Sequence, residues 1–377
     1  MGILHINDST KRDTVPRLDF ELTTGCDHKC GHCYNVWGAE DEDPQGGYKK
    51  GSLRLDEYLA MMDKVIDQTG ADHITITGGE PLLHKGALEI IEKACSKVST
   101  VQLITNGSHI TPEVARRFGK AGLRSVQLTL LSAQPHRHNL LKGADCFDDT
   151  VRAAMELREA RVPVQVCFVA MRTNWEEFEE VMELCYVLGV GGISYNRMSP
   201  TGGAIHNVRR LLPEVEHVEH NLLTAERLGP KYKIHVATAM PVPPCLIRME
   251  RFKWVQFGFC STGTHSPNIV VDPLGNIRSC NLSSGLLGNI IDEDWKTIFG
   301  RVTKYQTGFQ KKVPEMCKGC RYERSCQGGC KESAFATFGA TDHIEPFIYQ
   351  ARNPNWLTEK TADEGAPACP GALMGSS

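Results

Sequence analysis

Three cysteines stand close together near the start of the chain, at Cys26, Cys30 and Cys33. Their C-x3-C-x2-C spacing lets three thiolates hold three irons of a [4Fe–4S] cube and leaves the fourth iron open to another ligand. The alternative is a zinc loop or a set of buried free thiols. A structural zinc site usually takes four protein ligands, and His28 and His32 inside the loop are ill placed to complete one. The spacing therefore favours a redox cluster with an open iron.

The elements that must position this loop alternate along the first half of the chain. Short apolar runs predict strands, and the amphipathic stretches between them predict helices. The predicted strands are Leu18–Thr23, His73–Thr77, Thr100–Thr105, Ser125–Leu131, Pro163–Ala170 and Gly192–Asn196. The predicted helices are Leu55–Gln68, Ala87–Ser96, Pro112–Ala121, Phe147–Ala160 and Trp175–Leu188. This alternation indicates an α/β fold of about six parallel βαβ units, which periodicity alone allows to be a partial barrel or an open wound sheet.

The sequence changes character after Gly203. Asn207–Leu228 predicts a helical connector, and the prolines between Pro241 and Pro244 interrupt regular structure. From Cys245 onward the chain is rich in glycine and cysteine and poor in long periodic runs, so bound metal would compensate for a small apolar core. We therefore predict an N-terminal extension (1–16), a strand–helix domain (17–228), a linker (229–244) and a small Cys-rich domain (245–377).

Whole-chain properties narrow the class of protein. The chain has 377 residues and a net charge of −3, which gives no electrostatic case for nucleic acid or an anionic membrane as a partner. Residues 1–19 lack the apolar segment of a secretion signal, and no apolar run reaches membrane-spanning length, so we expect a cytoplasmic protein. The chain contains 15 cysteines. Because the cytosol is reducing, metal or redox chemistry explains these cysteines better than disulfides do.

The cysteine loop carries a resemblance to a known family. A C-x3-C-x2-C loop after the first strand, with the aromatic His32 before its last cysteine, resembles the defining motif of the radical S-adenosylmethionine (radical SAM) superfamily. The resemblance implies a partial (β/α)6 TIM-like barrel in which the open iron chelates the amino and carboxylate groups of S-adenosylmethionine. One electron from the cluster then releases a 5′-deoxyadenosyl radical, and a flavodoxin- or ferredoxin-type protein supplies the electron.

A second motif ends the second predicted strand, at Gly78, Gly79 and Glu80. It resembles the family motif that orients the methionyl amine. Glycine lets the backbone approach a ligand closely, and a carboxylate accepts hydrogen bonds from an ammonium group. The resemblance also implies that His32 packs near the adenine of S-adenosylmethionine.

The ends of the later strands resemble further cofactor contacts. Asn106 follows the third strand, and Arg197 ends the sixth, where it could reach a carboxylate. The fourth strand departs from the family pattern of Ser-x-Asp, because Thr129 is followed by two leucines and no acid. We therefore predict Thr129 as one ribose contact, with Ser132 or Gln134 as the substitute for the missing acid.

The cysteines of the last third resemble the SPASM extension, which carries two auxiliary [4Fe–4S] clusters in enzymes that modify peptides. The motif residues are Cys260, Cys280, Cys317, Cys320, Cys326, Cys330 and Cys369. Two closed clusters take eight thiolates, and Cys245 is the only other cysteine of this region. The resemblance implies that Cys245 closes an inner cluster held by Cys260, Cys280 and Cys330. It implies an outer cluster held by Cys317, Cys320, Cys326 and Cys369.

An alternative for Cys245 is a free thiol, which leaves the inner cluster open to substrate. With either role of Cys245, the resemblance implies three [4Fe–4S] clusters, one of which binds S-adenosylmethionine. The remaining thiols lie in apolar patterns and read as small buried residues: Cys95, Cys146, Cys167 and Cys185.

The resemblance implies that the radical modifies a peptide or protein by hydrogen-atom abstraction, giving a cross-link or an oxidation. Only 25 residues precede Cys26, so we expect leader-peptide recognition either to come from a separate protein or to be absent. Sulfatase-maturing relatives place a catalytic Asp directly after the second inner-cluster cysteine, where this chain has Asn281. That reaction is therefore disfavoured.

Two other functions stay open. One is a radical dehydrogenase or tailoring enzyme that acts on a small metabolite such as an aminocyclitol or a tetrapyrrole. The other is a non-catalytic iron–sulfur electron carrier, which would need no site for S-adenosylmethionine. His136 and His138, after the fourth strand, are further candidates for substrate contact, although loop histidines are more often solvated.

Overall fold

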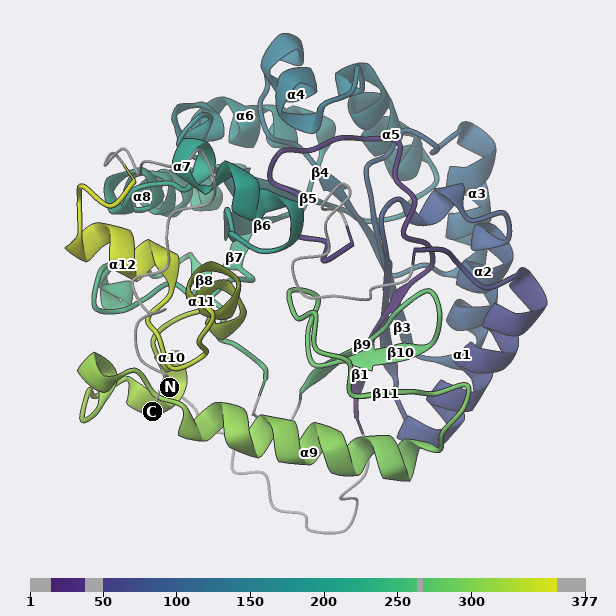
Figure 1. The fold of residues 1–377 in the computed structure, drawn as a ribbon. Helices are drawn as coiled ribbons and strands as arrows, with labels where there is room; N and C mark the ends of the chain where they lie inside the picture. The colour runs from purple at the N-terminus through teal and green to yellow at the C-terminus, as the bar shows by residue number, and fades with distance from the viewer. Residues whose placement is uncertain (1–14, 38–49, 263–266, 358–377) are drawn as a thin grey trace.

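The computed structural model describes residues 15–37, 50–262 and 267–357. A single open sheet forms its centre, with strand order β11-β10-β9-β1-β2-β3-β4-β5-β6-β7-β8 (Figure 1). The first six strands are parallel and neighbour one another in chain order: β1 Arg17–Glu21, β2 His73–Thr77, β3 Thr100–Thr105, β4 Ser125–Thr129, β5 Val164–Ala170 and β6 Gly192–Arg197. The predicted α/β fold with a partial barrel is confirmed, and the sheet does not close.

Helices cover the outer face of this curved sheet (Figure 1). They are α1 Leu55–Thr69, α2 Ala87–Lys97, α3 Pro112–Ala121, α5 Phe147–Glu159, α6 Phe178–Leu188 and α8 Val215–Tyr232. Two shorter helices, α4 Pro135–Lys142 and α7 Val208–Leu211, lie in the segments that follow β4 and β6. The start of α3 shows why the sequence signals worked, because the Thr111 hydroxyl accepts a hydrogen bond from the N–H of Val114 at 3.2 Å and Pro112 opens the helix.

The last third extends the sheet at both edges. Strands β7 His235–Thr238 and β8 Gln256–Phe257 continue it in parallel beyond β6. On the other side β9 Asn268–Val271 pairs in parallel with β1, followed by antiparallel β10 Asn276–Arg278 and β11 Gly288–Asn289. The expected linker, 229–244, thus holds the end of α8 and all of β7, while the division into domains stays a prediction.

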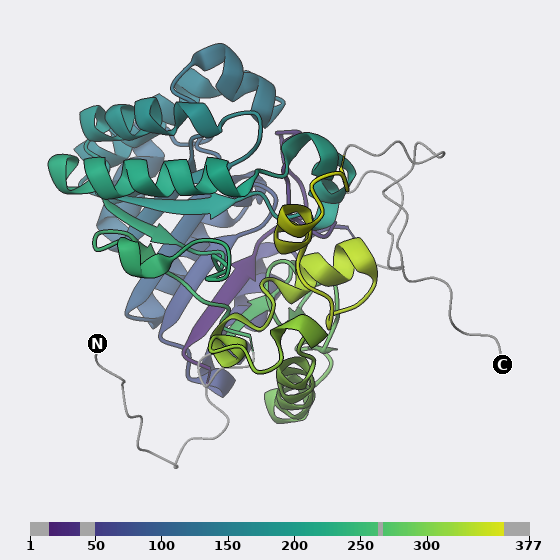
Figure 2. The ribbon, with the colours of Figure 1, turned by 90° about the vertical axis from the view of Figure 1, so that its left-hand side faces the viewer.

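Four further helices lie together at one side of the barrel (Figure 2): α9 Trp295–Lys311, α10 Glu323–Cys326, α11 Lys331–Phe338 and α12 Pro346–Arg352. The expectation that the last third lacks long periodic elements was wrong for α9, which has 17 residues. Trp295, Ile298 and Val302 are buried on one of its faces at helical spacing, and this packing stabilises the helix.

A buried ion pair joins the first strand to a strand of the last third of the sequence. Arg278 of β10 pairs with Glu21 of β1, and both side chains are almost fully buried. Arg278 also donates to the carbonyl oxygen of Ser283 at 2.8 Å and lies over the ring of Trp37. Burial raises the pKa of Glu21 to about 7, although the Arg278 charge opposes the shift. The pair therefore fixes β10 against β1.

The strands separate an apolar layer from a polar interior. Alternate residues such as Leu18 and Phe20 are buried against the helices. The intervening residues line a cavity of about 1460 Å³, with at least two on each of the first six strands, among them Asp19, Thr75, Gln102, Gln127, Gln165 and Ser194. Among the described helices, none is both long and apolar enough to cross a bilayer.

Candidate functional site

The N-terminal cysteine loop opens onto this cavity. Cys26, Cys30 and Cys33 all line it, and the N–H of Cys33 donates to the carbonyl oxygen of Cys30 at 3.1 Å. The Cys30 thiol donates to the carbonyl oxygen of Lys142, the last residue of α4, at 3.4 Å. Burial, together with the charges of neighbouring thiolates, raises the pKa of Cys26 and of Cys33 to about 11. These thiols therefore ionise only when a metal group takes the charge, which fits a donor set for iron.

The described residues contain no group of three His, Cys, Asp or Glu side chains arranged as ligands of a single ion. Ligands of one zinc ion all lie about 2.3 Å or less from the same atom. The thiolates of an iron–sulfur cube bind different irons and stand further apart. Cys26, Cys30 and Cys33 have the three-thiolate composition that a cube with one open iron requires.

Gly78 and Gly79 pack directly against the chain that leads into the loop. The N–H of Gly79 donates to the carbonyl oxygen of Thr23 at 2.8 Å, and the N–H of Glu80 donates to that of Gly25 at 2.8 Å. A Cβ on Gly79 would stand 2.2 Å from the Gly25 oxygen, and Gly78 has φ of +143°. The motif thus requires glycine because its backbone touches the backbone before Cys26.

Glu80 is fully buried and its carboxylate is already occupied by donors from the protein. Oε2 accepts from the N–H of Asn106 at 2.7 Å. Oε1 accepts from the Thr105 hydroxyl at 2.7 Å and from the N–H of Leu82 at 3.0 Å. The carboxylate therefore joins the ends of β2 and β3, and it holds Asn106 in place.

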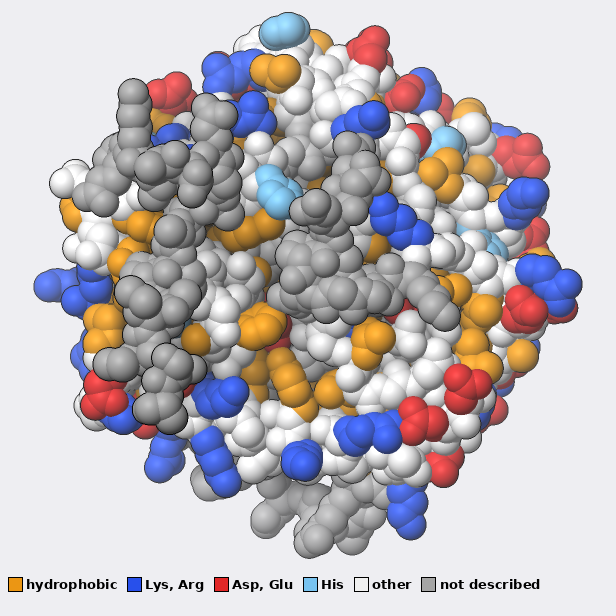
Figure 3. Space-filling model, in the orientation of Figure 1, with side chains coloured by type: hydrophobic (Ala, Val, Ile, Leu, Met, Phe, Trp, Pro, Cys, Tyr) orange, Lys and Arg blue, Asp and Glu red, His pale blue; other side chains and the backbone are white. Residues whose placement is uncertain are grey.

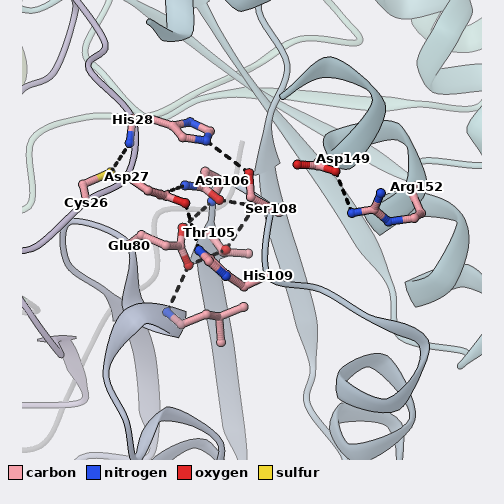
Figure 4. Close-up of polar contacts among 12 residues, drawn as sticks. Cys26, Asp27, His28, Glu80, Thr105, Asn106, Ser108, His109, Asp149 and Arg152 are labelled. Atoms are coloured by element: carbon pink, nitrogen blue, oxygen red, sulfur yellow. Dashed lines mark hydrogen bonds and ion pairs between the residues drawn. The ribbon is translucent and has the colours of Figure 1, made fainter. Parts of the chain in front are cut away.

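Asn106 continues this chain of contacts into the cysteine loop (Figure 4). Its Nδ2 donates to Oδ1 of Asp27 at 2.7 Å, and its Oδ1 accepts from the N–H of Ser108 at 2.9 Å. His109 lies 2.8 Å from the other oxygen of Asp27. Burial opposes ionisation of Asp27, but these two donors outweigh it, and the pKa of Asp27 lies below its usual value. Asp27, Asn106 and Glu80 therefore fix the loop to the strands.

The remaining cofactor contacts predicted from the sequence separate into two groups. His32, Thr129 and Arg197 line the cavity. Burial lowers the pKa of His32 to about 3, and its Nδ1 has no hydrogen-bond partner within the described part of the chain. Ser132 does not line the cavity, and its hydroxyl accepts from the N–H of Gln134 at 2.8 Å within its own turn.

Arg197 carries free donors beside the cavity. Its Nη2 donates to the carbonyl oxygen of Pro241 at 3.2 Å and pairs with Glu345. Its Nε and Nη1 are buried and have no hydrogen-bond partner among the described residues. A buried guanidinium with two unused donors fits a carboxylate ligand such as that of S-adenosylmethionine.

The C-terminal thiols form two groups. Burial raises the pKa of Cys280 and of Cys330, and the nearby Cys260 thiolate raises both further. We call Cys260, Cys280 and Cys330 the inner group; all three line the cavity.

The second group is the outer group, which consists of Cys245, Cys317, Cys320 and Cys326. Burial raises the pKa of Cys317 and of Cys326, and the Cys245 thiolate raises both further. The Cys320 thiolate acts in the same direction on Cys245. Cys245 is thus close enough to Cys317, Cys320 and Cys326 for their charges to interact, while Cys369 lies outside the described residues.

The cavity contains functional residues that the sequence patterns did not single out. Lys142 is buried beside the cysteine loop, where its charge lowers the pKa of His28 and of His32, in addition to the larger effect of burial. Basic residues in the lining outnumber acidic ones: Arg17, Lys29, Lys50, Lys142, Arg197 and Lys331 against Asp19 and Glu332. The sequence carries no distinct signal for Lys142, because the stretch Pro135–Lys142 is mostly polar. Asp19 was not predicted because it is one polar residue in the polar–apolar alternation of β1.

The two histidines after β4 have no place in the cavity. His136 is exposed. His138 is fully buried in α4, its Nδ1 accepts from the N–H of Leu131 at 3.3 Å, and its ring packs edge-on against Phe147. His138 therefore stabilises the turn after β4.

Comparisons with known proteins agree with this geometry. Residues 20–185 match the family model described as the radical SAM superfamily. The chain is 26% identical over 356 residues to an AdoMet-dependent heme synthase of Methanosarcina barkeri, covering 89% of this chain and 97% of that protein. It is 24% identical over 332 residues to a PqqA peptide cyclase of Granulibacter bethesdensis, covering 86% and 85%. It is 24% identical over 347 residues to the mycofactocin maturase MftC of Mycobacterium tuberculosis, covering 89% and 83%.

Solved structures share the fold. SuiB of Streptococcus suis, bound to S-adenosylmethionine, has a TM-score of 0.68 at 14% identity and covers 90% of this chain and 78% of its own. The enzyme anSMEcpe, with bound AdoMet, has a TM-score of 0.68 at 18% identity and covers 91% and 96%. Together with the match over residues 20–185, these comparisons show that the chain contains a radical SAM domain and shares the fold of SuiB and anSMEcpe.

Proposed function

We propose that the chain reductively cleaves S-adenosylmethionine at a [4Fe–4S] cluster on Cys26, Cys30 and Cys33, and modifies a peptide or protein by hydrogen-atom abstraction. One observation carries the proposal. A single cavity receives the three thiols of the N-terminal loop and the three of the inner group. A substrate in this cavity would lie between the radical source and a second redox group.

The cluster supplies the electron that breaks the sulfonium bond, and the protein does the positioning. Gly79 and Glu80 hold the backbone before Cys26, and Asn106 holds Asp27 within the loop. Arg197 offers Nε and Nη1 to a carboxylate. The strand walls around the cavity keep the reacting groups away from bulk water.

The inner and outer groups support a proposal of two auxiliary [4Fe–4S] clusters. Each group consists of thiols only, and soft thiolate ligands select iron–sulfur clusters or zinc over hard cations. The inner group lines the cavity, so its cluster would accept the electron that a substrate radical loses on oxidation.

A peptide is the substrate class that the cavity wall supports best. Gln102, Gln127 and Gln165 present side-chain amides from three neighbouring strands. Amide side chains donate and accept hydrogen bonds as a peptide backbone does. One of the relatives is named for peptide chemistry, a PqqA peptide cyclase, and another is named as a maturase, mycofactocin maturase MftC.

The test begins with the radical. Anaerobically reconstituted chain, given S-adenosylmethionine and dithionite, should release 5′-deoxyadenosine. Replacing Cys26, Cys30 and Cys33 with Ala should abolish the release, and continued release would refute the proposal. Co-expression with a short peptide encoded beside the gene should then give a mass change in that peptide. If S-adenosylmethionine is cleaved but the peptide is unchanged, the peptide substrate is refuted and a small metabolite becomes the favoured substrate.

The small-metabolite alternative has its own support. The alignment with the heme synthase of M. barkeri covers 97% of that protein. In addition, the excess of basic residues in the cavity would suit an acidic tetrapyrrole. Tight binding of an iron porphyrin with free carboxylates, seen as a shift of its visible absorption, would favour this function. The non-catalytic carrier is excluded if 5′-deoxyadenosine is released.

We also propose that a flavodoxin- or ferredoxin-type donor in the cytoplasm docks on α9. Basic side chains gather over this helix at the lower edge of Figure 3. They are the exposed Lys296, Arg301, Lys304, Lys311 and Lys312, and α9 contains no acidic residue. Phe309 of α9 lines the cavity beside the inner group. An acidic partner would be steered to this surface, and the reduction rate should fall as salt is raised.

A further inference from the structure

We propose that a flavodoxin-type protein docks in a recess on α9 and passes its electron to the cluster of the inner group. The inner cluster then reduces the N-terminal cluster across the cavity. One electron moves in each step, and no bond is formed or broken. This inference rests on the proposed function, because it assumes that the inner group holds a [4Fe–4S] cluster. It goes further by choosing one class of donor, its docking site and the first electron acceptor.

The recess is a hollow of about 370 Å³ beside the large cavity. Tyr305 and Phe309 line it one helical turn apart, with their ring centres 5.9 Å from each other. Gly308 also lines it, and a Cβ on this residue would meet nothing within 4 Å. Aromatic rings pack well against other flat rings. The recess therefore offers a site for a flat aromatic group of a partner.

Positive charge surrounds the recess. Lys304 and Lys312 are exposed and line it, and neither forms an ion pair in the parts of the chain that the structure describes. Arg301 lines it as well, but its charge is paired with that of Glu293. Two lysines are thus available to the carboxylates of a partner. An acidic protein would be attracted to this surface and oriented on it.

The recess also contains a polar atom that lacks a partner. The hydroxyl oxygen of Thr341, a residue of the recess lining, is buried and forms no hydrogen bond with any described residue. Buried hydroxyl groups usually form at least one hydrogen bond, so a group of the docked partner is expected to satisfy this one.

These features favour a flavin over an iron–sulfur cluster as the group that docks. A flavodoxin is an acidic protein that exposes the apolar edge of a planar flavin ring. It therefore matches both the aromatic lining of the recess and the two lysines. A ferredoxin encloses its cluster in a protein loop and has no planar ring to place against Tyr305 and Phe309.

The aromatic residues of the recess also contact the chain beside the inner group. Phe309 lines both the recess and the cavity. Its carbonyl oxygen accepts a hydrogen bond from Nζ of Lys331, which lies 4.6 Å from the centre of its ring. The Tyr305 hydroxyl donates to Oε1 of Glu332 at 2.7 Å. Because Lys331 and Glu332 directly follow Cys330, both rings are joined by direct contacts to the chain at an inner-group thiol.

This route gives the inner cluster two uses in one turnover. It first passes the electron of the donor to the N-terminal cluster and is thereby oxidised again. It is then ready to accept the electron that a substrate radical loses. The docking site beside α9 and the cavity thus lie on opposite sides of the same redox group.

The first experiment fills the recess. In Gly308→Leu, we expect the dissociation constant for purified flavodoxin to rise about tenfold or more at low salt, because the new side chain overlaps the docked ring. Calorimetry would measure the binding, which needs neither S-adenosylmethionine nor a substrate. Gly300→Leu is the matched control, because it lies on α9 outside the recess and a Cβ there also meets nothing within 4 Å.

Three results of this experiment would overturn the docking site. They are wild-type protein that does not bind flavodoxin, unchanged binding by Gly308→Leu, and equal loss of binding in Gly308→Leu and Gly300→Leu.

The second experiment tests the charge around the recess. Combined Lys304→Glu and Lys312→Glu replacements should slow association with flavodoxin about tenfold or more, because repulsion replaces attraction. Lys296→Glu, also exposed on α9 but outside the recess, should have a smaller effect. If Lys296→Glu slows association as much as the double variant, the charge of the helix and not the recess directs the donor.

The class of donor is tested with a [2Fe–2S] ferredoxin of similar net charge. It should bind Gly308→Leu as well as it binds the wild type, because it places no ring in the recess. If Gly308→Leu weakens ferredoxin binding as strongly as flavodoxin binding, the choice of a flavin is wrong.

The third experiment identifies the first electron acceptor. In the full chain with Cys26, Cys30 and Cys33 replaced by Ala, only the auxiliary clusters remain. Reduced flavodoxin should still reduce a cluster, seen by electron paramagnetic resonance, and Gly308→Leu in this background should slow the reduction. Dithionite, which needs no docking, should reduce both proteins equally fast. If flavodoxin reduces no cluster in the triple-alanine chain, the electron enters at the N-terminal cluster and the inference fails.

Two further replacements in this background separate the inner cluster from the outer one. Cys280→Ala removes an inner thiol and should abolish the reduction by flavodoxin, whereas Cys320→Ala removes an outer thiol and should preserve it. The reverse pattern would make the outer cluster the first acceptor and would overturn the route. The proposed function is tested separately, by 5′-deoxyadenosine release with dithionite, so either can fail without the other.

Discussion

The side-chain amide of Asn281 donates a hydrogen bond to Oδ2 of Asp19 at 2.7 Å. The amide of Asn268 donates to the same oxygen at 2.5 Å, so two residues of the last third hold a carboxylate of β1. Burial raises the pKa of Asp19 although these amides oppose the shift. Asn281 directly follows Cys280 of the inner group, at the position where sulfatase-maturing enzymes have a catalytic Asp. In this chain the Asn281 side chain instead contacts an acid of β1, Asp19. Asp19 is thus a carboxylate available to substrate in the cavity.

Asp19→Asn should separate cleavage of S-adenosylmethionine from modification of the substrate. The variant keeps the shape of the side chain but removes its charge and proton-accepting oxygen. A positioned acid or base contributes about 10²-fold or more to a rate, so we expect product formation to fall by that order. Release of 5′-deoxyadenosine should stay within a few-fold of wild type. If product formation and 5′-deoxyadenosine release fall equally, Asp19 has only a structural role.

Gly79→Ala should remove the N-terminal cluster. The new Cβ would meet the carbonyl oxygen of Gly25 at 2.2 Å, so the chain leading to Cys26 has to move. We expect loss of about four irons per chain and loss of 5′-deoxyadenosine release, measured by iron analysis and chromatography. Gly191→Ala is the matched control, because a Cβ there meets nothing within 4 Å. Wild-type iron content in Gly79→Ala would contradict the packing argument.

Glu21→Gln should strongly destabilise the fold. It leaves the buried Arg278 charge without its counter-charge, which typically costs about 3–5 kcal/mol. Chemical denaturation of the protein would measure the change. Glu293→Gln breaks the exposed pair with Arg301 and should cost less than about 1 kcal/mol. Similar costs for the two variants would mean that the buried pair does not hold β10 against β1.

His138 should make the protein acid-sensitive. Burial lowers the pKa of His138 to about 3, and the charges of Lys142, His28 and His32 lower it further. In the unfolded chain this histidine binds a proton near pH 6.5, whereas in the folded chain it stays neutral down to its lowered pKa. The contribution of His138 to the unfolding free energy is therefore complete above about pH 6.5 and is lost as the pH falls toward the pKa of His138 in the folded protein. At pH 5 the loss is about 2 kcal/mol.

The control for this effect is His138→Asn, whose side-chain oxygen can accept the hydrogen bond from the N–H of Leu131. The difference in unfolding free energy between pH 7 and pH 5 should be smaller in the variant than in wild type by about 2 kcal/mol. The other buried histidines are present in both proteins and cancel. An identical pH dependence would show that His138 is not the group that titrates.

The sequence was sufficient for the barrel because its local signals agree with its packing. His73–Thr77 and Thr100–Thr105 have the same bounds in prediction and structure, since each is a short apolar run flanked by helical patterns. Predicted strand ends such as Thr23 and Leu131 ran past the last paired residue. Those residues belong to loops that carry the site, where backbone contacts rather than periodicity set the path.

The last third was less predictable for a physical reason. Its strands β8, β10 and β11 have two or three residues each and are held by pairing to distant segments. The grouping of Cys245 likewise depends on the contact of Glu250 with Tyr322, 72 positions away in sequence. Spacing along the chain identifies thiols as ligands, but it does not show which of them meet in space.

The parallel pairing of β1 with β9 has a consequence for biosynthesis. Asp19 and Asn268 are 249 positions apart, yet they meet across this pair of strands. While the nascent chain leaves the ribosome, the edge of β1 stays unpaired until most of the protein has been made. The Cys26–Cys33 loop follows that edge directly. Its final environment therefore forms late in synthesis, and delivery of iron and sulfide to a partly made chain would meet an exposed, incomplete site.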